Sequence, residues 1–491
     1  MTKENATSQA GSDGEIASEF TLSATSAGRE VRPLSHFHEW WADRHRNGNF
    51  EVTRVPFEQL DDWHFESGTG NLRHTSGRYF TVAGLRVRDG SAGTPWEQPV
   101  LNQPEIGILG ILAKYFNGVL HFLMQAKMEP GNVNSLQLSP TVQATRSNYS
   151  RVHRGAHTRY LEYFREPRQG RVLVDVLQSE QGAWFLGKRN RNMVVRTDGD
   201  VPEHEDFHWL TLRQLRALLG VDHLVSMDAR TVLASLPLAP PRASLARTGA
   251  APGTSGTTAH PRPFTDALLR SYEPEHEGGG ALHTRYELLS WFTERKTALD
   301  WSVDLIPLAD VRNWRRDADE IADDERREFR IMAARVLAEN REVSKWSQPL
   351  LAPRGEAAAV FLTRTIRGVL HVLVQAMPQP GLRDLVELGP TVYVPPGGDP
   401  AAAAAGLPFG GAATGTDPER VRFDTTLSEE GGRFFHARTR YRVVEAGPDF
   451  PVEVPATHCW MTVRQLNDLV QHGHYLNIEA RSLLACVHSL W

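Results

Sequence analysis

The sequence predicts an α+β protein in which one domain, a mixed or mostly antiparallel sheet with few helices, occurs twice in tandem. The main observation is an internal repeat, because motifs recur in the same order about 250 residues later in the 491-residue chain. The second is a series of short runs in which apolar and polar residues alternate, as is typical of strands. Only a few segments have the apolar spacing of a helix, so we expect helices to be a minority.

Four pairs of motifs are separated by 250 residues. They are Trp96-Glu-Gln-Pro with Trp346-Ser-Gln-Pro, GVLHFLMQA (His121) with GVLHVLVQA (His371), Pro140-Thr-Val with Pro390-Thr-Val, and Gln178-Ser-Glu-Gln-Gly with Ser428-Glu-Glu-Gly-Gly. Toward the ends the separation is 251, for Trp63 and Trp314 and for the motifs that begin at Trp209 and Trp460. Chance supplies one such pair but not six in order. We therefore expect a first repeat over residues 31–240 and a second over 282–491.

Three further segments have the composition of irregular chain. Residues 1–30 are rich in Ser, Thr, Gly, Ala and Glu without an apolar period, which predicts a disordered tail. Residues 241–281 include a stretch rich in Pro, Gly, Ala, Ser and Thr, which predicts a flexible linker. Residues 395–418 hold a run of alanines between Gly and Pro, and we expect a surface loop there rather than a helix.

Helices are predicted at corresponding places in both repeats. The amphipathic segments 37–45 and 286–296 predict a helix near the start of each repeat. Thr211-x-x-Gln214 and Thr462-x-x-Gln465 have the spacing of a capping box, which marks the first turn of a helix. Residues 481–490 are apolar at helical spacing and end the second repeat.

Composition excludes several classes of protein. The 54 basic and 59 acidic residues give a formal net charge of −5, which provides no global positive field for nucleic acid or an anionic membrane. No apolar run approaches the roughly 18 residues of a membrane helix, and the N-terminus lacks the apolar core of a secretory signal. Two cysteines, Cys459 and Cys486, are too few for a disulfide framework or a Cys-rich zinc site. We therefore expect a soluble cytoplasmic protein without nucleic-acid or membrane partners.

A predicted hairpin over residues 120–129 and 136–145 carries two aligned polar faces. Side chains alternate along a strand, so one face shows His121, Leu123, Gln125, Lys127 and Glu129 on the first strand and Gln137, Ser139, Thr141, Gln143 and Thr145 on the second. Amides and hydroxyls are groups that orient a polar ligand such as a sugar, whereas a solvated face usually carries Lys and Glu. In the second repeat Met377 and Gln379 replace Lys127 and Glu129. We therefore expect a catalytic first repeat and a second repeat with a degenerate site and an assembly role, with a merely solvated face as the alternative.

Basic and aromatic residues near this hairpin predict a diphosphate site. The candidates are Arg146, Asn148, Tyr149 and His153 directly after the hairpin, and Lys188 and Arg191 further along. Tyr149, Tyr160 or Trp96 could stack on a base. His204-Glu-Asp-Phe-His208 matches a zinc-protease pattern, but that chemistry requires a helix, and here Pro202 precedes the motif and the helix cap falls later.

The motifs WEQPVLNQPEIGILG, LMQAKMEPGNVNSLQLSPTVQATRSNY, LQSEQGAWFLGKRNRN, HTRYELLSWF, NREVSKWSQPLL and EARSLLAC resemble those of the NDP-hexose 2,3-dehydratases of deoxysugar biosynthesis. The resemblance spans about residues 35–491. It implies a tandem duplication of a Nudix-like domain, a homodimer, no cofactor, and the substrate dTDP-4-keto-6-deoxyglucose. It also implies functional coupling to a 3-ketoreductase and a role in the biosynthesis of a glycosylated natural product. The chain has no Nudix box, so neither Nudix hydrolysis nor its metal is implied.

The implied reaction removes water across C2 and C3 of the sugar. The C4 ketone acidifies the C3 proton, a base removes it, and an acid assists departure of the C2 hydroxyl. As a hypothesis, Glu129 or His153 is the base or acid, Tyr149 is a further acid candidate, and Lys127 stabilises the enolate. The expected substrate-binding residues are Trp96, His121, Gln125, Gln137, Ser139, Thr141, Gln143, Arg146, Asn148, Lys188 and Arg191. The alternatives are a non-catalytic sugar-nucleotide binder or scaffold, and a keto-sugar epimerase.

Overall fold

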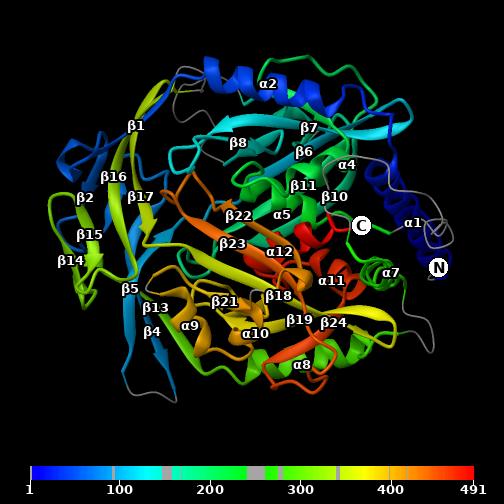
Figure 1. The fold of residues 1–491 in the computed structure, drawn as a ribbon. Coiled ribbons are helices and arrows are strands. Elements are labelled where there is room, and N and C mark those ends of the chain that lie inside the picture. The colour runs from blue at the N-terminus through cyan, green and yellow to red at the C-terminus, as the bar shows by residue number, and fades with distance from the viewer. Residues whose placement is uncertain are drawn as a thin grey trace.

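The computed structural model describes residues 3–90, 94–145, 158–166, 168–239, 260–274, 280–338, 343–397, 399–415 and 417–491. Across these residues the strands form two seven-stranded and two five-stranded sheets, and several of the helices lie between the two larger ones (Figure 1). The expectation of an α+β protein with few helices and mostly antiparallel sheets is confirmed.

The larger sheet of each repeat has seven strands in the same arrangement. In the first repeat they are β6 (Gly107–Phe116), β7 (Val119–Met128), β8 (Leu136–Ser139), β9 (Val142–Ala144), β10 (Arg171–Ser179), β11 (Arg189–Arg196) and β12 (Phe207–Leu210). In the second they are β18 (Ala357–Ile366), β19 (Val369–Pro378), β20 (Val386–Gly389), β21 (Val392–Val394), β22 (Val421–Ser428), β23 (Arg438–Glu445) and β24 (His458–Thr462). The pairs β6–β11 and β18–β23 are parallel and the other pairs of these sheets are antiparallel.

The smaller sheets exchange one strand between the repeats. One contains β2 (Trp63–Phe65), β3 (Leu72–His74), β4 (Thr81–Asp89) and β5 (Trp96–Asn102) together with β13 (Trp301–Ile306) of the second repeat. The other contains β14 (Trp314–Arg316), β15 (Glu320–Asp323), β16 (Phe329–Ala338) and β17 (Lys345–Pro353) together with β1 (Phe50–Val55) of the first. Each repeat therefore completes a sheet of the other.

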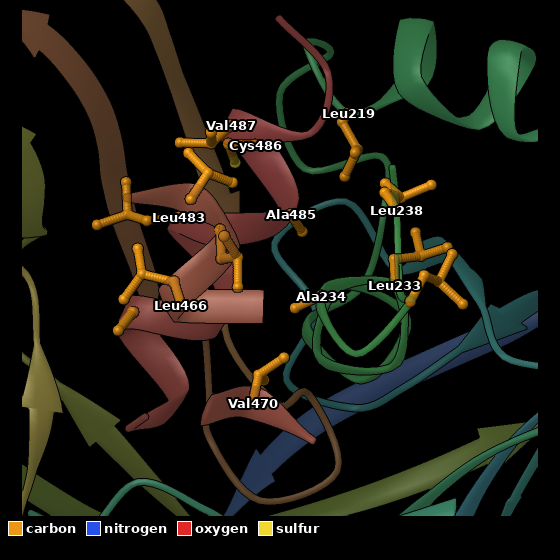
Figure 2. Close-up of a cluster of buried hydrophobic side chains, with 14 of the residues drawn as sticks. Leu219, Leu233, Ala234, Leu238, Leu466, Val470, Leu483, Ala485, Cys486 and Val487 are labelled. Carbon is orange, nitrogen blue, oxygen red and sulfur yellow. The ribbon is translucent and has the colours of Figure 1, made fainter. Parts of the chain in front are cut away.

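Reciprocal contacts show that the two repeats are related by an approximate two-fold axis. The Gly131 N–H donates to the Gly431 carbonyl at 2.7 Å, and the Gly381 N–H donates to the Gly182 carbonyl at 2.7 Å. Helices α5 (Met227–Ala234) and α12 (Ile478–Val487) pack against each other between the two larger sheets (Figure 1). In Figure 2 Ala234 from the first repeat lies opposite Ala485 of the second, within one continuous hydrophobic core.

Two buried arginines join the repeats in the same reciprocal way. The Arg230 guanidinium on α5 donates to the carbonyls of Val225 (2.8 Å) and Ser428 (3.0 Å) and to the hydroxyl of Ser482 (3.2 Å). Arg481 on α12 donates to the carbonyls of Leu476 and Ser179 and to the Thr231 hydroxyl, the last at 2.8 Å. Both side chains are fully buried, so these contacts satisfy backbone carbonyls that have no access to water.

The helices predicted from local sequence are confirmed. They are α2 (Leu34–Asn47) and α8 (Arg285–Thr297) near the start of each repeat, α4 (Leu212–Leu218) and α11 (Val463–Val470) after the capping boxes, and α12 at the end. Thr211 and Thr462 accept the amide protons of Gln214 and Gln465, and each Gln side chain accepts in return from the cap residue's N–H. The described residues also contain short 3₁₀ helices, which are η1 (Phe57–Gln59), η2 (Leu161–Tyr163), η3 (Leu308–Asp310) and η4 (Pro418–Arg420).

The expected tail and linker both contain a packed helix. Helix α1 (Lys3–Thr25) buries Phe20, and α7 (Arg262–Arg270), which lies in the expected linker, buries Phe264. A serine anchors each helix region to its sheet, since the Ser23 hydroxyl donates to the Leu120 carbonyl at 2.6 Å and Ser271 makes the same contact with the following repeat. Helix α7 also buries Leu268, and the serines satisfy backbone carbonyls at the interface, contacts that composition alone does not reveal. Helix α7 thus contacts the second repeat as α1 contacts the first.

Two other expectations differ from the structure. Residues 395–418 contain α9 (Pro400–Ala405) and α10 (Gly410–Thr414), because Asp399 caps α9 and Pro400 occupies its first turn, where proline is tolerated. In the fourth motif pair Ser428 corresponds to Ser179 rather than to Gln178, since each of these serines ends its strand opposite an arginine. Within the described ranges every helix is too short or too polar to cross a bilayer.

Candidate active site

A cavity of about 550 Å³ lies between the two repeats. The first repeat lines it with β2, β3, the start of β6, the end of β7, β9, the start of β11 and α5, and the second repeat lines it with β17 and the segment after β22. Its charged and amide lining residues are Asp61, Asp62, Gln103, Lys127, Glu129, Gln143, Lys188, Asn190, Asp228, Lys345, Gln348, Glu430 and Arg433. Its aromatic lining residues are Trp63, His74, Tyr79, Phe80 and Trp346.

Lys127, Glu129 and Gln143 meet in this cavity. The Lys127 ammonium lies 2.7 Å from Glu129 Oε1 and donates to Gln143 Oε1 at 2.6 Å. The side chains of Lys127 and Glu129 are 9% and 11% exposed. A charge pair that is this poorly hydrated is attracted more strongly than a surface pair, and its position is fixed by the amide of Gln143.

The strand that carries this pair is buried on both faces, which differs from the expected polar face. Phe122 and Met124 enter the main core on one side, and Leu123 enters a second apolar cluster on the other. Only the carboxyl end of β7 emerges from this packing, and there Lys127 and Glu129 point into the cavity. The second predicted strand, residues 136–145, forms two short strands instead of one. Its first part, β8, pairs with β7 up to Ser139, and its second part, β9, pairs with β6.

A second layer of polar residues supports the cavity floor. The Lys188 ammonium donates to the Glu105 carbonyl at 2.6 Å, and burial lowers the pKa of this lysine despite nearby carboxylates. Asn190 donates to Glu180 at 2.6 Å and accepts the Gly107 N–H at 3.1 Å. Burial and the neighbouring Glu430 raise the pKa of Glu180 to about 7.

The second repeat supplies residues that sequence reasoning missed. Glu430 and Arg433 follow β22, and Trp346 lies on β17. The Arg433 guanidinium lies 4.6 Å from the centroid of the Phe80 ring and donates to Gln103 at 3.0 Å. The repeated motifs contained the signal, since Trp346 and Glu430 belong to two of them, but only the two-fold arrangement brings them to the first repeat's site.

Asp228 is also a lining residue that sequence reasoning missed. It lies in the first turn of α5, whose cap residue Ser226 accepts the Ala229 N–H at 3.2 Å. The residue is 5% exposed, and burial together with neighbouring carboxyls raises its pKa well above the ordinary value. An aspartate in the first turn of a helix ordinarily indicates helix stabilisation, so no separate signal marks Asp228 as a site residue.

Several predicted binding residues lie away from the cavity and have other partners. His121 is fully buried and accepts the Val31 N–H at 3.1 Å, as His371 accepts from Leu282 in the second repeat. Thr141 accepts the Leu112 N–H at 2.8 Å and joins the sheet at the point where the strand crosses over. The polar atoms of both residues are used by the backbone, which explains their recurrence in the two repeats.

Trp96 and Arg191 are on the protein surface. Trp96 is 40% exposed and packs edge-to-face against Trp301 with ring centroids 6.4 Å apart. The Arg191 guanidinium binds the Asp175 carboxylate across the strand pair, with Nε donating at 2.6 Å. Neither residue lines the cavity.

The remaining predicted residues are near the site or outside the description. Gln125 lines a separate hollow of about 40 Å³ beside α2, and Gln137 and Ser139 are buried on β8. Gln137 donates to Asn134 at 3.1 Å. Arg146, Asn148, Tyr149 and His153 lie outside the described residues. His204 and His208 flank the start of a strand, β12, rather than sharing a helical turn.

The corresponding place in the second repeat has different chemistry. Met377 and Gln379 stand where Lys127 and Glu129 stand, and Trp184 occupies the position of Arg433. The Gln379 side chain is buried and accepts the Gly182 N–H at 3.2 Å. Apolar side chains have therefore replaced the two cations of the first site, and an amide has replaced its carboxylate.

The fold and this cavity define a duplicated α+β protein with a polar cavity between its two repeats. Comparison with known proteins gives the family. A family model described as NDP-hexose 2,3-dehydratase matches residues 34–236 and again 285–487, so the chain belongs to this family and contains its domain twice. Three similar proteins are each named dTDP-4-dehydro-6-deoxy-alpha-D-glucopyranose 2,3-dehydratase. The one from Streptomyces violaceoruber is 47% identical over 94% of this chain and 98% of its own length. Those from Saccharopolyspora spinosa and Amycolatopsis orientalis are 45% and 44% identical, over 96% and 97% of this chain and 95% and 94% of their own lengths.

Proposed function

We propose that this protein removes water across C2 and C3 of dTDP-4-keto-6-deoxy-D-glucose to give the 3,4-diketo-2,6-dideoxy sugar nucleotide. The observation that carries the proposal is the buried trio of Lys127, Glu129 and Gln143 in a cavity large enough for a sugar nucleotide. The relatives named for this reaction match nearly the whole chain, which favours it over a scaffold or an epimerase.

The roles follow from the charges at the cavity floor. The C4 ketone acidifies the C3 proton, and Glu129 is the base that removes it. The Lys127 ammonium, which Glu129 and Gln143 hold in position, stabilises the enolate oxygen at C4. His153 and Tyr149 remain candidates for proton transfer, since Thr145 and Thr158, which flank their segment in the chain, both line the cavity.

The diphosphate and the base require cations and an aromatic surface. Lys188, Arg433 and Lys345 are the lysines and arginines that line the cavity besides Lys127, among the described residues. Arg433 is best placed for the diphosphate, because it is only partly buried and a guanidinium donates two parallel bonds to phosphate. The half-buried indole of Trp346 offers a stacking surface for thymine.

The proposal is tested by incubating the protein with the keto sugar nucleotide and a 3-ketoreductase, which traps the diketo product. We expect Glu129→Gln and Lys127→Met each to lower kcat by about 100-fold or more, because each removes one group from the reacting centre. Gln379→Glu and Met377→Lys, at the corresponding positions of the second repeat, serve as matched variants and should leave turnover unchanged. Full turnover by both first-repeat variants would exclude this site.

Further features of the proposal come from the family resemblance. We propose a Nudix-like fold for each repeat, a homodimer, and a cytoplasmic enzyme that acts with a 3-ketoreductase in deoxysugar biosynthesis for a glycosylated natural product. The reaction itself is a redox-neutral elimination, so the chemistry requires no redox cofactor. Sedimentation at micromolar protein concentration measures the oligomeric state directly.

A further inference from the structure

The elimination needs a proton donor as well as a base. Hydroxide is a poor leaving group, so the C2 oxygen departs readily only when an acid protonates it. The Lys127 ammonium beside Glu129 favours the carboxylate form of that residue, which suits it to act as the base. Another residue must therefore act as the acid. Among the described residues, the other carboxyl groups that line the cavity are Asp61 and Asp62, which are exposed, and Asp228 and Glu430, which are less exposed. The candidates among them are therefore Asp228 and Glu430.

Asp228 is surrounded by groups that oppose its ionisation. Two carboxyls from neighbouring segments face it, Glu180 after β10 and Glu430 after β22, and Glu129 faces it from the end of β7. Lys127, at the end of β7, acts in the opposite direction and favours the carboxylate. The buried arginines of α5 and α12 are engaged with backbone carbonyls and hydroxyls, as described above. Burial is the largest cause of the raised pKa of Asp228, and the three carboxyls add to it.

The helix to which Asp228 belongs acts in the opposite direction but with less effect. The positive end of α5 favours a carboxylate, but this effect of the helix dipole is smaller than the cost of removing a carboxylate from water in a protein interior. Burial and the three carboxyls therefore favour the protonated form of Asp228. Glu430 also has a raised pKa, but Arg433 and Lys188 both favour its carboxylate.

We propose that Asp228 is the catalytic acid that protonates the departing C2 oxygen, with Glu129 as the base at C3. This inference rests on the proposed function. Glu129 takes the C3 proton, and the electron pair of the C3–H bond forms the enolate. That pair then forms the C2–C3 double bond as the C2–O bond breaks, and the oxygen leaves with the Asp228 proton as water.

The same two groups can return to their starting states. The elimination leaves an enol with a hydroxyl on C3, a protonated Glu129 and an ionised Asp228. Transfer of the O3 proton to Asp228 and of the Glu129 proton to C2 gives the 3,4-diketo sugar. Each carboxyl then carries its original proton count, so turnover requires no other acid, base or oxidant.

A change of leaving group tests this role. In the 2-deoxy-2-fluoro analogue of the keto sugar nucleotide, fluoride departs without a proton. We expect Asp228→Asn to lower turnover of the hydroxyl substrate by about 100-fold or more, and to release fluoride within about threefold of the wild-type rate. Glu129→Gln should lose both activities, because both substrates require removal of the C3 proton.

The chain supplies a matched control. Glu479 is the counterpart of Asp228 in α12, where Asn477 caps the helix as Ser226 caps α5. Burial raises the pKa of Glu479 to about 8, so glutamine imitates its neutral form. Glu479 is not among the described residues that line the cavity. We expect Glu479→Gln to match the wild type on both substrates.

The wild-type protein provides a second measurement that needs no variant. Because the acid must be protonated, turnover of the hydroxyl substrate should fall as pH rises through the raised pKa, and fluoride release should lack this limb. The assignment is overturned if the Asp228→Asn variant keeps the wild-type Tm and its turnover of both substrates falls equally, or if its turnover of neither substrate falls. It is also overturned if the rates for both substrates fall alike at alkaline pH. Wild-type protein that turns over neither substrate refutes the proposed function itself.

Discussion

Replacing Trp346 by alanine is expected to weaken binding of dTDP about 30-fold, while the same change at Trp96 leaves binding unchanged. The two tryptophans begin the same repeated motif, so the sequence does not distinguish them. The structure does, because the two-fold arrangement places Trp346 at the cavity and leaves Trp96 on the surface against Trp301.

The magnitude follows from the setting of the Trp346 ring. The indole is half-buried, its N–H donates to Gln348 at 2.9 Å, and it lies beside Phe50 with ring centroids 6.5 Å apart. A ring fixed in this way has little freedom to lose on binding, so loss of one aromatic–base stack should be near the middle of the usual range of about 1–3 kcal/mol. A value of about 2 kcal/mol corresponds to a factor of about 30 in Kd.

Isothermal titration with dTDP measures this effect without catalysis. Trp346→Phe should retain most of the affinity, since it keeps an aromatic face, and Trp96→Ala should bind within about twofold of the wild type. Equal losses in Trp346→Ala and Trp96→Ala, or unchanged binding in both, would refute the placement of the nucleotide beside β17.

Two further predictions concern stability. Arg230→Met should lower the free energy of unfolding by about 2–5 kcal/mol in denaturant titrations, because it leaves two buried carbonyls and the Ser482 hydroxyl without their donor. A loss below about 1 kcal/mol would contradict a stabilising role for the Arg230 hydrogen bonds between the repeats. Burial lowers the pKa of His371 from 6.5 to about 4. Between these pH values the imidazole is protonated in the unfolded state but not in the folded state, so the free energy of unfolding should fall as pH drops from about 6.5 toward 4. His371→Gln should remove up to about 3 kcal/mol of that pH dependence, and an unchanged profile would show that another group causes it.

The parts of the fold that were predicted correctly depend on short stretches of sequence. The capping boxes at Thr211 and Thr462 involve residues three positions apart, and the motif pairs report the duplication directly. Helices α1 and α7 were missed because their stability comes from a few contacts with distant strands, such as Ser23 with Leu120. Propensity and composition do not contain such tertiary contacts.

The candidate site was predicted only where the chain itself brings residues together. Lys127, Glu129 and Gln143 lie on adjacent segments of one predicted hairpin, and the structure places all three in the cavity. His121 and Thr141 share the same alternation, but the second face of β7 is covered by an apolar cluster, so their polar atoms bond to backbone instead. Alternation identifies a face, whereas packing decides whether that face meets a cavity.

The cavity's place between the repeats gives a physical reason for retaining both copies. A separate first repeat would lack Trp346, Glu430 and Arg433 at the cavity, and its smaller sheet would lack β13. The second repeat is free to lose the Lys127 and Glu129 equivalents, because those positions face the other side of the two-fold axis. It is not free to lose β17 or the segment after β22, because these form one wall of the first repeat's cavity. The second copy thus forms part of the wall of this cavity, and we expect mutations in that wall to affect substrate binding as directly as mutations in the first repeat.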